Sequence, residues 1–381
     1  MDGDVEGIKR FIDPIYMNKM RLRIATTGFF PKEQSLGISN TVFLISRNLI
    51  KRGVDVSIYT MKTKGTLAEE EFEGIKIHRF GYTKIVPGID YNVSIDMFNA
   101  LKAGYADIIH SFHYAYYPAT AGFAAAGIKC LPHIFTTSYH PAQLTALKTL
   151  MMRLYNVTQG KFILKGSFKT LPQNTDELNH LRRIASFDHA IVPCPLNEDV
   201  FYPRKKAGVL TVLFVGTMVP WKGAGIAFDI CRDIERDHKN VRFVFIGDGF
   251  LRKELMKRAS KRFVFLRNIS NQDLALWYSK ADVFLYPTKY ESFGRVLAEA
   301  QLSGAPIVTT RVGGVPETVG SAGFLVDYGD WDRMKEYTIR LLTDNALRKR
   351  ASRQSIKHAQ QYKSKLVTDK IYRIYKRALA N

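Results

Sequence analysis

The chain has 381 residues, of which 46% are hydrophobic and 24% are charged, and its formal net charge is +21. This length exceeds one ordinary hydrophobic core, and the composition excludes a disordered or fibrous protein, so we expect two globular domains. The positive charge favours nucleic acid, anionic lipid surfaces or phosphorylated substrates as partners, and charge alone does not choose among them.

The length of the apolar runs and the number and spacing of the cysteines indicate where the protein is located. No apolar run approaches the ~18–20 residues that span a bilayer, and the first residues include acids where a signal peptide is basic and then apolar. Cys130, Cys194 and Cys231 are widely spaced and odd in number, which indicates neither a disulfide framework nor a metal-ligand pair. We therefore expect a cytoplasmic protein.

The first half alternates strand-like and helix-like segments after a polar leader at residues 1–20. Apolar patterning predicts strands at 22–30, 54–59, 107–111 and 133–137, and a helix over 41–51. This alternation predicts an open parallel sheet in a domain spanning 21–192.

A proline-containing stretch, assigned to 193–207, interrupts the periodicity and is typical of an interdomain linker. A second alternation follows in a domain predicted over 208–355. Its predicted strands are 210–215, 241–246, 263–266, 283–286 and 307–309. Residues 356–381, which are basic with Leu and Tyr at helical spacing, predict a C-terminal helical segment.

The loop and helix after the strand at 283–286 hold the clearest chemical pattern. Open α/β sheets bind ligands beyond the carboxyl ends of their strands, and a helix N-terminus attracts a phosphate. Gly294 lets a phosphate approach the backbone, while Glu291 is placed to accept from sugar hydroxyls and Glu299 from a ribose. A capping role for Glu291 and a surface role for Glu299 stay open from the spacing alone.

Two further turns lie at the same predicted edge. The segment FVGTMVPWKG (214–223) places Lys222 just beyond a strand end, where an ammonium neutralises a phosphate. The segment VGGVPE (312–317) supplies a second glycine-rich turn.

In order, FVGTMVPWKG, FIGDG (245–249), ESFGRVLAE with its Glu-x7-Glu spacing, and VGGVPE resemble glycosyltransferase family 4. The resemblance covers nearly all of the second half, and the first half is similar more loosely, through its first strand, the Gly37 loop and KRGVDVSIYT. It implies the GT-B fold, in which two Rossmann-like domains face each other across a cleft. It also implies retaining transfer of a hexose or N-acetylhexosamine from a UDP- or GDP-sugar.

Carried over by position, the resemblance implies that Glu291 faces the donor hexose, Glu299 the ribose and Lys222 the diphosphate. The donor phosphate would also meet the backbone of four consecutive residues, Phe293, Gly294, Arg295 and Val296.

On the opposing domain, the resemblance implies that Gly37 approaches the donor phosphate and that His140 acts beside the acceptor. A hydrogen-bonded structural role for His140 stays open. His110 and His113 are assigned only to the lining of the cleft.

The chain departs from the family pattern at two places. The family usually has an arginine in the first phosphate turn, where this chain has Thr217, and Arg295 is one possible substitute. The segment VPCPLNED (192–199) stands where the family commonly has a Pro-Asn-Gly-x-Asp turn, which bears on the hinge.

We expect no cofactor beyond the donor substrate and no metal, because no Asp-x-Asp pair is placed like a metal-held diphosphate site. The nearest rival is a GT-B-like sugar-nucleotide epimerase. A nucleic-acid-binding protein would explain the charge but none of the ordered motifs. A dehydrogenase lacks the G-x-G-x-x-G turn after the first strand.

The segment 148–169 holds five basic residues and no acid, interleaved with apolar residues. This pattern predicts contact with an anionic membrane surface and a lipid-linked or glycolipid acceptor at its cytosolic face. A core helix with a solvated basic face is equally consistent with the pattern, and a soluble sugar or sugar-phosphate acceptor fits that alternative.

Overall fold

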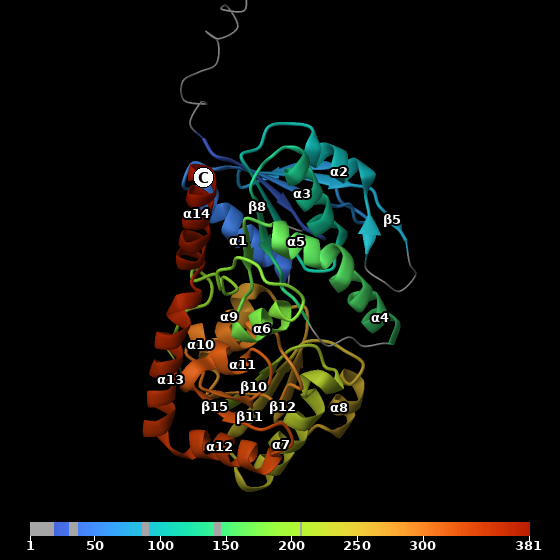
Figure 1. The fold of residues 1–381 in the computed structure, drawn as a ribbon. Coiled ribbons are helices and arrows are strands. Elements are labelled where there is room, and N and C mark those ends of the chain that lie inside the picture. Colours follow the sequence, from blue (N-terminus) through green and yellow to red (C-terminus); the bar gives the residue numbers. More distant parts are fainter. Residues whose placement is uncertain (1–18, 30–36, 86–90, 141–145, 206–207) are drawn as a thin grey trace, which may run out of the picture.

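The computed structural model describes residues 19–29, 37–85, 91–140, 146–205 and 208–381. Within these ranges, seven strands form the first sheet, in the order β3-β4-β2-β1-β7-β8-β9 (Figure 1). They are β1 (Arg21–Ala25), β2 (Asp55–Met61), β3 (Glu69–Phe72), β4 (Ile75–Phe80), β7 (Ile108–Phe112), β8 (His133–Thr136) and β9 (Lys169–Leu171). Among the described strands of this sheet, the β3–β4 pair alone is antiparallel. A separate ribbon pairs β5 (Thr83–Lys84) with β6 (Asn92–Val93).

Several helices of the first half are amphipathic or have a side-chain cap at their first turn. Val42, Ile45 and Leu49 of α1 recur at helical spacing and are buried. Ser94 caps α2 and Asn174 caps α6, each through its side-chain oxygen. The bounds are α1 (Ile38–Ile50), α2 (Ile95–Lys102), α3 (Tyr117–Ile128), α4 (Ala146–Tyr155), a π-helical turn (Asn156–Gly160), α5 (Lys161–Gly166) and α6 (Thr175–Arg182).

Over residues 208–381, six parallel strands form a second sheet in the order β12-β11-β10-β13-β14-β15. They are β10 (Leu210–Val215), β11 (Val241–Ile246), β12 (Phe263–Leu266), β13 (Val283–Tyr286), β14 (Ile307–Thr310) and β15 (Gly323–Val326). Phe214, Phe245 and Phe284 are buried in this sheet, because a parallel sheet is covered by helices on both faces.

The covering helices of the second half alternate with the strands. They are α7 (Ala224–Asp237), α8 (Arg252–Arg258), α9 (Asn271–Lys280), α10 (Arg295–Leu302), α11 (Val315–Val319), α12 (Trp331–Thr343) and α13 (Asn345–Ala359). Short 3₁₀ turns occupy Pro220–Lys222, Gly320–Ala322 and Gln360–Tyr362.

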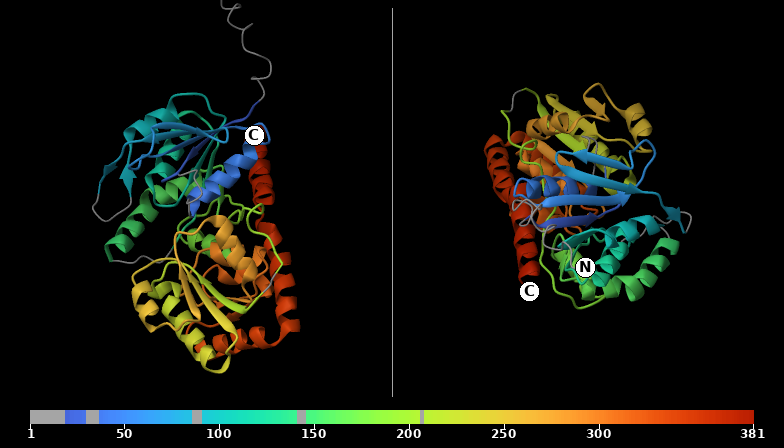
Figure 2. Two further views of the ribbon diagram at one scale, coloured as in Figure 1. Left: turned by 180° about the vertical axis from the view of Figure 1, so that it is seen from behind. Right: turned by 90° about the horizontal axis from the view of Figure 1, so that it is seen from above.

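The last helix, α14 (Ser364–Ala380), returns to the first half of the chain. Val367, Ile371 and Tyr375 are buried in the same core as Leu22 and Ile45. Seen from the front and from behind, α14 lies beside α1 (Figures 1 and 2). The predicted C-terminal segment is therefore helical, but its position against the first sheet was not foreseen from the sequence.

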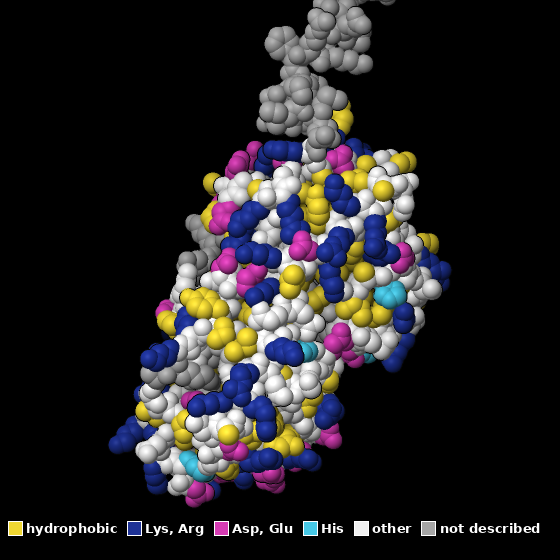
Figure 3. All heavy atoms as spheres, turned by 90° about the vertical axis from the view of Figure 1, so that its left-hand side faces the viewer, with side chains coloured by type: hydrophobic (Ala, Val, Ile, Leu, Met, Phe, Trp, Pro, Cys, Tyr) yellow, Lys and Arg dark blue, Asp and Glu magenta, His cyan; other side chains and the backbone are white. Residues whose placement is uncertain are grey.

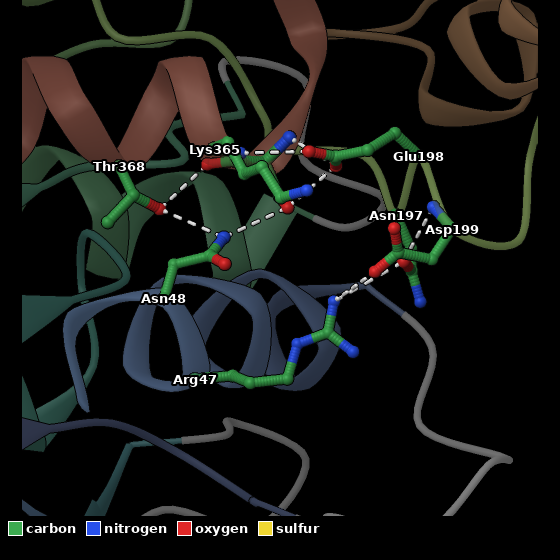
Figure 4. Close-up of polar contacts among 8 residues, drawn as sticks. Arg47, Asn48, Asn197, Glu198, Asp199, Lys365 and Thr368 are labelled. Atoms are coloured by element: carbon green, nitrogen blue, oxygen red, sulfur yellow. Dashed lines mark hydrogen bonds and ion pairs between the residues drawn. The ribbon is translucent and has the colours of Figure 1, made fainter. Parts of the chain in front are cut away.

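Polar contacts around the start of α14 hold the chain where it crosses from the second half back to the first (Figure 4). Glu198 accepts from the backbone N–H of Ser364 at 2.8 Å, which caps α14. Asn48 of α1 donates to the Ser364 hydroxyl at 2.9 Å. Arg47, one residue earlier, donates to Asp199 at 3.3 Å. Helix α1, the segment 197–199 and α14 thus meet at one point.

Most predicted strands lie where the sequence placed them. The strands predicted at 210–215, 241–246, 263–266 and 283–286 have those bounds, whereas the strand predicted at 22–30 ends at Ala25. Lys and Arg side chains are scattered over the face in Figure 3, with Asp and Glu side chains among them.

Candidate functional site

Lys222 and Glu291 come together at the carboxyl edge of the second sheet. Lys222 Nζ lies 2.5 Å from Glu291 Oε1, and Tyr286 donates to the same oxygen at 2.7 Å. The turn after β10 reaches this point because Gly223 has a φ of +76°, and a Cβ there would lie 2.1 Å from the Pro287 carbonyl oxygen. The glycine lets the lysine turn pack against the loop after β13.

The backbone that follows Glu291 is fixed by the second glycine turn. Gly314 N–H donates to the Glu291 carbonyl at 2.9 Å, and a Cβ on Gly314 would lie 1.8 Å from the Ser292 carbonyl oxygen. Helix α10 then begins after Gly294, which has a φ of +76° and makes no side-chain cap. The positive end of α10 therefore lies beside the Lys222–Glu291 pair.

Of the residues that the resemblance assigns to the phosphate backbone contact, Phe293 is buried, and Arg295 and Val296 are half-buried. The Arg295 side chain runs toward the first half of the chain. Its Nη1 lies 3.3 Å from Thr41 Oγ1 of α1 and 3.2 Å from Cys194 Sγ. Its contacts therefore join α10 to α1 and to the segment between the sheets.

Glu299 is only 6% exposed. Its Oε1 accepts from Arg295 Nε at 2.8 Å, and its Oε2 accepts from the Tyr278 hydroxyl at 3.3 Å. Burial raises the pKa of Glu299, against the lowering effect of Arg295. Both oxygens thus have protein partners, and a contact of Glu299 with a ribose stays a prediction.

Gly37 directly precedes α1 as its N-cap, with a φ of +69°, and no atom of the described residues would lie within 4 Å of a Cβ there. Thr217 follows β10, and its side chain is exposed. Nε and Nη1 of Arg295 contact Glu299, Thr41 and Cys194, away from the first phosphate turn, while Nη2 is buried without a hydrogen-bond partner among the described residues.

His140 is exposed on the first half, where its ring lies 4.7 Å from the ring of Tyr290 on the second half. The neighbouring backbone is held across the halves, because the Ser292 hydroxyl donates to the Tyr139 carbonyl at 2.9 Å. Asn174 also donates to the Ser292 carbonyl. The predicted acceptor-side and donor-side loops therefore touch.

The buried carboxylate of Glu177 lies behind this loop and was not predicted from the sequence. Glu177 of α6 accepts from the Tyr139 backbone N–H at 2.6 Å and the Gln173 backbone N–H at 2.8 Å, and also from the Thr137 hydroxyl. Burial raises the pKa of Glu177 to about 7, against these three donors. It fixes the backbone that leads to His140, and one Glu in a helical pattern carries no sequence signal for that role.

A cavity of about 840 Å³ lies between the halves, within the usual size of a small-molecule site. Of the predicted site residues, His140 and Lys222 line it, while Glu291 contacts Lys222 from behind. Gly37, Gly294 and Glu299 do not line it. Tyrosines from several elements form much of the remaining wall: Tyr91, Tyr114, Tyr116, Tyr139, Tyr155 and Tyr290.

His113 also lines this cavity, as the sequence assignment to the cleft lining predicted. Its Nδ1 lies 3.0 Å from the Thr27 hydroxyl, and burial lowers its pKa to about 4. Its imidazole is therefore neutral near pH 7. His110, in contrast, is fully buried between Tyr375 and Thr136, so its assignment to the cleft lining is wrong. The two histidines stand three positions apart in HSFH, and side chains at an odd spacing along a strand point to opposite faces. The assignment of both to the cleft lining did not use that signal.

In the described ranges, no three His, Cys, Asp or Glu side chains gather as metal ligands would. Over the same ranges, no helix is long and apolar enough to cross a membrane.

Comparison with known proteins shows the family. The model of "Glycosyl transferases group 1" matches residues 197–358, and that of "Glycosyltransferase Family 4" matches residues 36–162. The chain belongs to glycosyltransferase family 4. Among curated relatives of this glycosyltransferase is an uncharacterized glycosyltransferase of Methanocaldococcus jannaschii, 28% identical over 79% of this chain and 84% of the relative. Another is a D-inositol 3-phosphate glycosyltransferase of Corynebacterium diphtheriae, 24% identical over 94% of this chain and 95% of the relative.

Solved structures confirm the GT-B fold of this family 4 member. A sucrose-phosphate synthase from Thermosynechococcus elongatus superposes with a TM-score of 0.75 and 19% identity, covering 95% of this chain and 100% of the other. The Anabaena protein HepE, solved with UDP and glucose, superposes with a TM-score of 0.73 and 16% identity, covering 94% of this chain and 100% of the other. The predicted arrangement of two Rossmann-like domains is thus confirmed.

Proposed function

We propose that this glycosyltransferase moves a hexose or N-acetylhexosamine from a UDP- or GDP-sugar, with retention and without a metal, to an acceptor bound in the cavity between the halves. The observation that carries the proposal is the Lys222–Glu291 pair, 2.5 Å apart at the positive end of α10, with Lys222 in the cavity wall. The HepE structure with UDP and glucose supports a nucleotide-sugar donor.

In this proposal Lys222 and α10 stabilise the leaving diphosphate. Negative charge grows on the diphosphate as the bond to the sugar breaks, and a fixed ammonium and a helix N-terminus stabilise that charge without reorganising. Among the hydrogen bonds of the described residues, those to the Glu291 carboxylate engage only Oε1. Its Oε2 is then left to accept from a hydroxyl of the donor sugar.

The acceptor would meet the donor from the first half, beside His140. In a front-face retaining reaction the departing diphosphate takes the acceptor proton, so no covalent nucleophile is required of the protein. The loops of His140 and Tyr290 touch beside the cavity. Closure of the site around the donor would exclude water and so disfavour hydrolysis of the donor. We propose a lipid-linked or saccharide acceptor, reached at a membrane surface.

The test is a panel of UDP- and GDP-sugars, each measured for protection of the protein against thermal unfolding and then for transfer. A ligand that binds only the native state raises its stability. The expected result is protection by one donor, followed by a product with the donor's anomeric configuration. Interconversion of the free nucleotide sugar without acceptor would instead establish an epimerase, and an inverted product would contradict retention.

A further inference from the structure

Helix α4 carries its apolar residues on the outside. Leu147, Leu150, Leu154 and Val157 recur at spacings of three and four residues, along α4 and into the π-helical turn that follows it. They are 50%, 63%, 53% and 69% exposed. A helix of a globular protein normally turns such a stripe toward the core. We call these four residues the α4 stripe.

The opposite side of α4 is the wall of the cavity. Met151, Met152 and Tyr155 line the cavity, so the helix separates the cavity from solvent. Leu154 belongs to both surfaces, because it lines the cavity and is 53% exposed. The sequence had left open a core helix with a solvated basic face. That interpretation is wrong for the α4 stripe, although Ile163 and Leu164 of α5 are buried.

Basic residues lie close to the stripe along the chain. Lys148, Arg153, Lys161 and Lys165 lie along the same stretch, and residues 146–166 hold no Asp or Glu. The described residues that line the cavity behind α4 likewise include three lysines and no carboxylate. Apolar side chains flanked by cations, with no acid between them, match the interface of a bilayer that contains anionic lipid.

We propose that the α4 stripe docks on an anionic membrane surface, and that the acceptor is a lipid whose head enters the cavity past Leu154. The acceptor half of this inference rests on the proposed function, whereas the docking half does not. Leu154 both lines the cavity and is exposed, so it places an apolar side chain where the tail of such a lipid would leave the cavity. A contiguous exposed apolar patch on a globular protein usually marks a surface that contacts a partner or a membrane.

The docking is tested by sedimentation of the full chain with vesicles of phosphatidylcholine mixed with phosphatidylglycerol, and of phosphatidylcholine alone. The double substitution Leu150→Gln, Leu154→Gln changes exposed positions, so the fold is retained. Leu67→Gln is a matched control, because Leu67 is 69% exposed elsewhere in the first half. We expect binding to the mixed vesicles and release by high salt. The stripe variant should bind about tenfold more weakly, and the control should bind as the unchanged chain does.

Absence of binding to mixed vesicles, or equal binding by the stripe variant, would overturn the docking. Protection by the nucleotide sugar is measured on the same samples and separates the two proposals. Absence of vesicle binding by the unchanged chain, with protection by a donor intact, contradicts only the membrane surface. Vesicle binding without protection by any donor contradicts the proposed function. If the protein docks but transfers the sugar equally well to a soluble acceptor without vesicles, the lipid acceptor is wrong.

Discussion

Lys222 and Glu291, 69 positions apart in the chain, form an ion pair at 2.5 Å where the turns after β10 and β13 meet. The lysine side chain is 26% exposed and lines the cavity, whereas the glutamate side chain is 14% exposed and does not line it. An ammonium held by a carboxylate in this position is oriented before a diphosphate arrives. This orientation is the physical basis of the predictions on transfer.

Replacing Glu291 by Gln should lower kcat about a hundredfold or more while leaving the melting temperature near that of the unchanged chain. The amide still accepts from Lys222 and Tyr286, but the charge that faces the donor sugar is lost. Steady-state kinetics at saturating donor measure the effect, with Glu254→Gln on the exposed face of α8 as the control. Near-native turnover of Glu291→Gln would place the donor sugar elsewhere.

Arg295 and Glu299 should behave as a structural unit. Arg295→Met alone leaves the Glu299 carboxylate buried without its cation, and we expect a loss of about 3 kcal/mol in the free energy of unfolding. The double variant Arg295→Met, Glu299→Leu should recover most of that loss, because neither charge remains. Urea unfolding measures both, and equal stability of the single and double variants would show that the pair is not coupled.

Thr217→Arg should tighten donor binding. The turn after β10 lacks the arginine that the family usually has there, and Nε and Nη1 of Arg295 are occupied by Glu299, Thr41 and Cys194. A new arginine at this exposed position would bind a phosphate through two hydrogen bonds and lower the donor Kd about tenfold. Calorimetry measures the Kd, and Thr217→Gln controls for size. Unchanged affinity would mean that another group already fills the role.

Acid should destabilise the protein through its buried histidines. Burial lowers the pKa of His113 to about 4 and that of His133 to about 3, and lowers that of His110 as well. The unfolded chain binds these protons near pH 6.5, so stability falls as the pH drops from about 7 toward 4. Glu177, with its pKa raised to about 7, contributes the opposite slope between pH 4.5 and 7.

The contribution of one histidine is isolated by His133→Gln. Unfolding by urea at a series of pH values should show a slope that is weaker by up to about 1.4 kcal/mol per pH unit than in the unchanged chain. The variant also loses hydrogen bonds to Ser111 and Ser167, which lowers its stability at every pH. Parallel pH profiles of the two proteins would contradict a neutral buried His133.

The sequence allowed the second sheet to be predicted more closely than the first. Short runs of β-branched and aromatic residues predicted both ends of four of its strands, and the ordered motifs placed Lys222 and Glu291 at one edge. The return of α14 to the first sheet depends on contacts of Val367 and Tyr375 with residues 300 or more positions away, which periodicity does not encode. The same holds for Arg295, whose contacts with Thr41 and Cys194 cross between the halves.

The central claim is that Lys222 binds the donor diphosphate in place of a metal ion. Calorimetric titration of the best donor from the panel, in buffer with excess EDTA, tests this claim on the unchanged chain, Lys222→Ala and Lys261→Ala. Lys261 is an exposed lysine outside the cavity wall and serves as the control. We expect the unchanged chain and Lys261→Ala to bind equally well in EDTA, and Lys222→Ala to lose at least about tenfold in affinity. Loss of binding by the unchanged chain in EDTA, restored by Mg²⁺ or Mn²⁺, or undiminished binding by Lys222→Ala, would contradict the account.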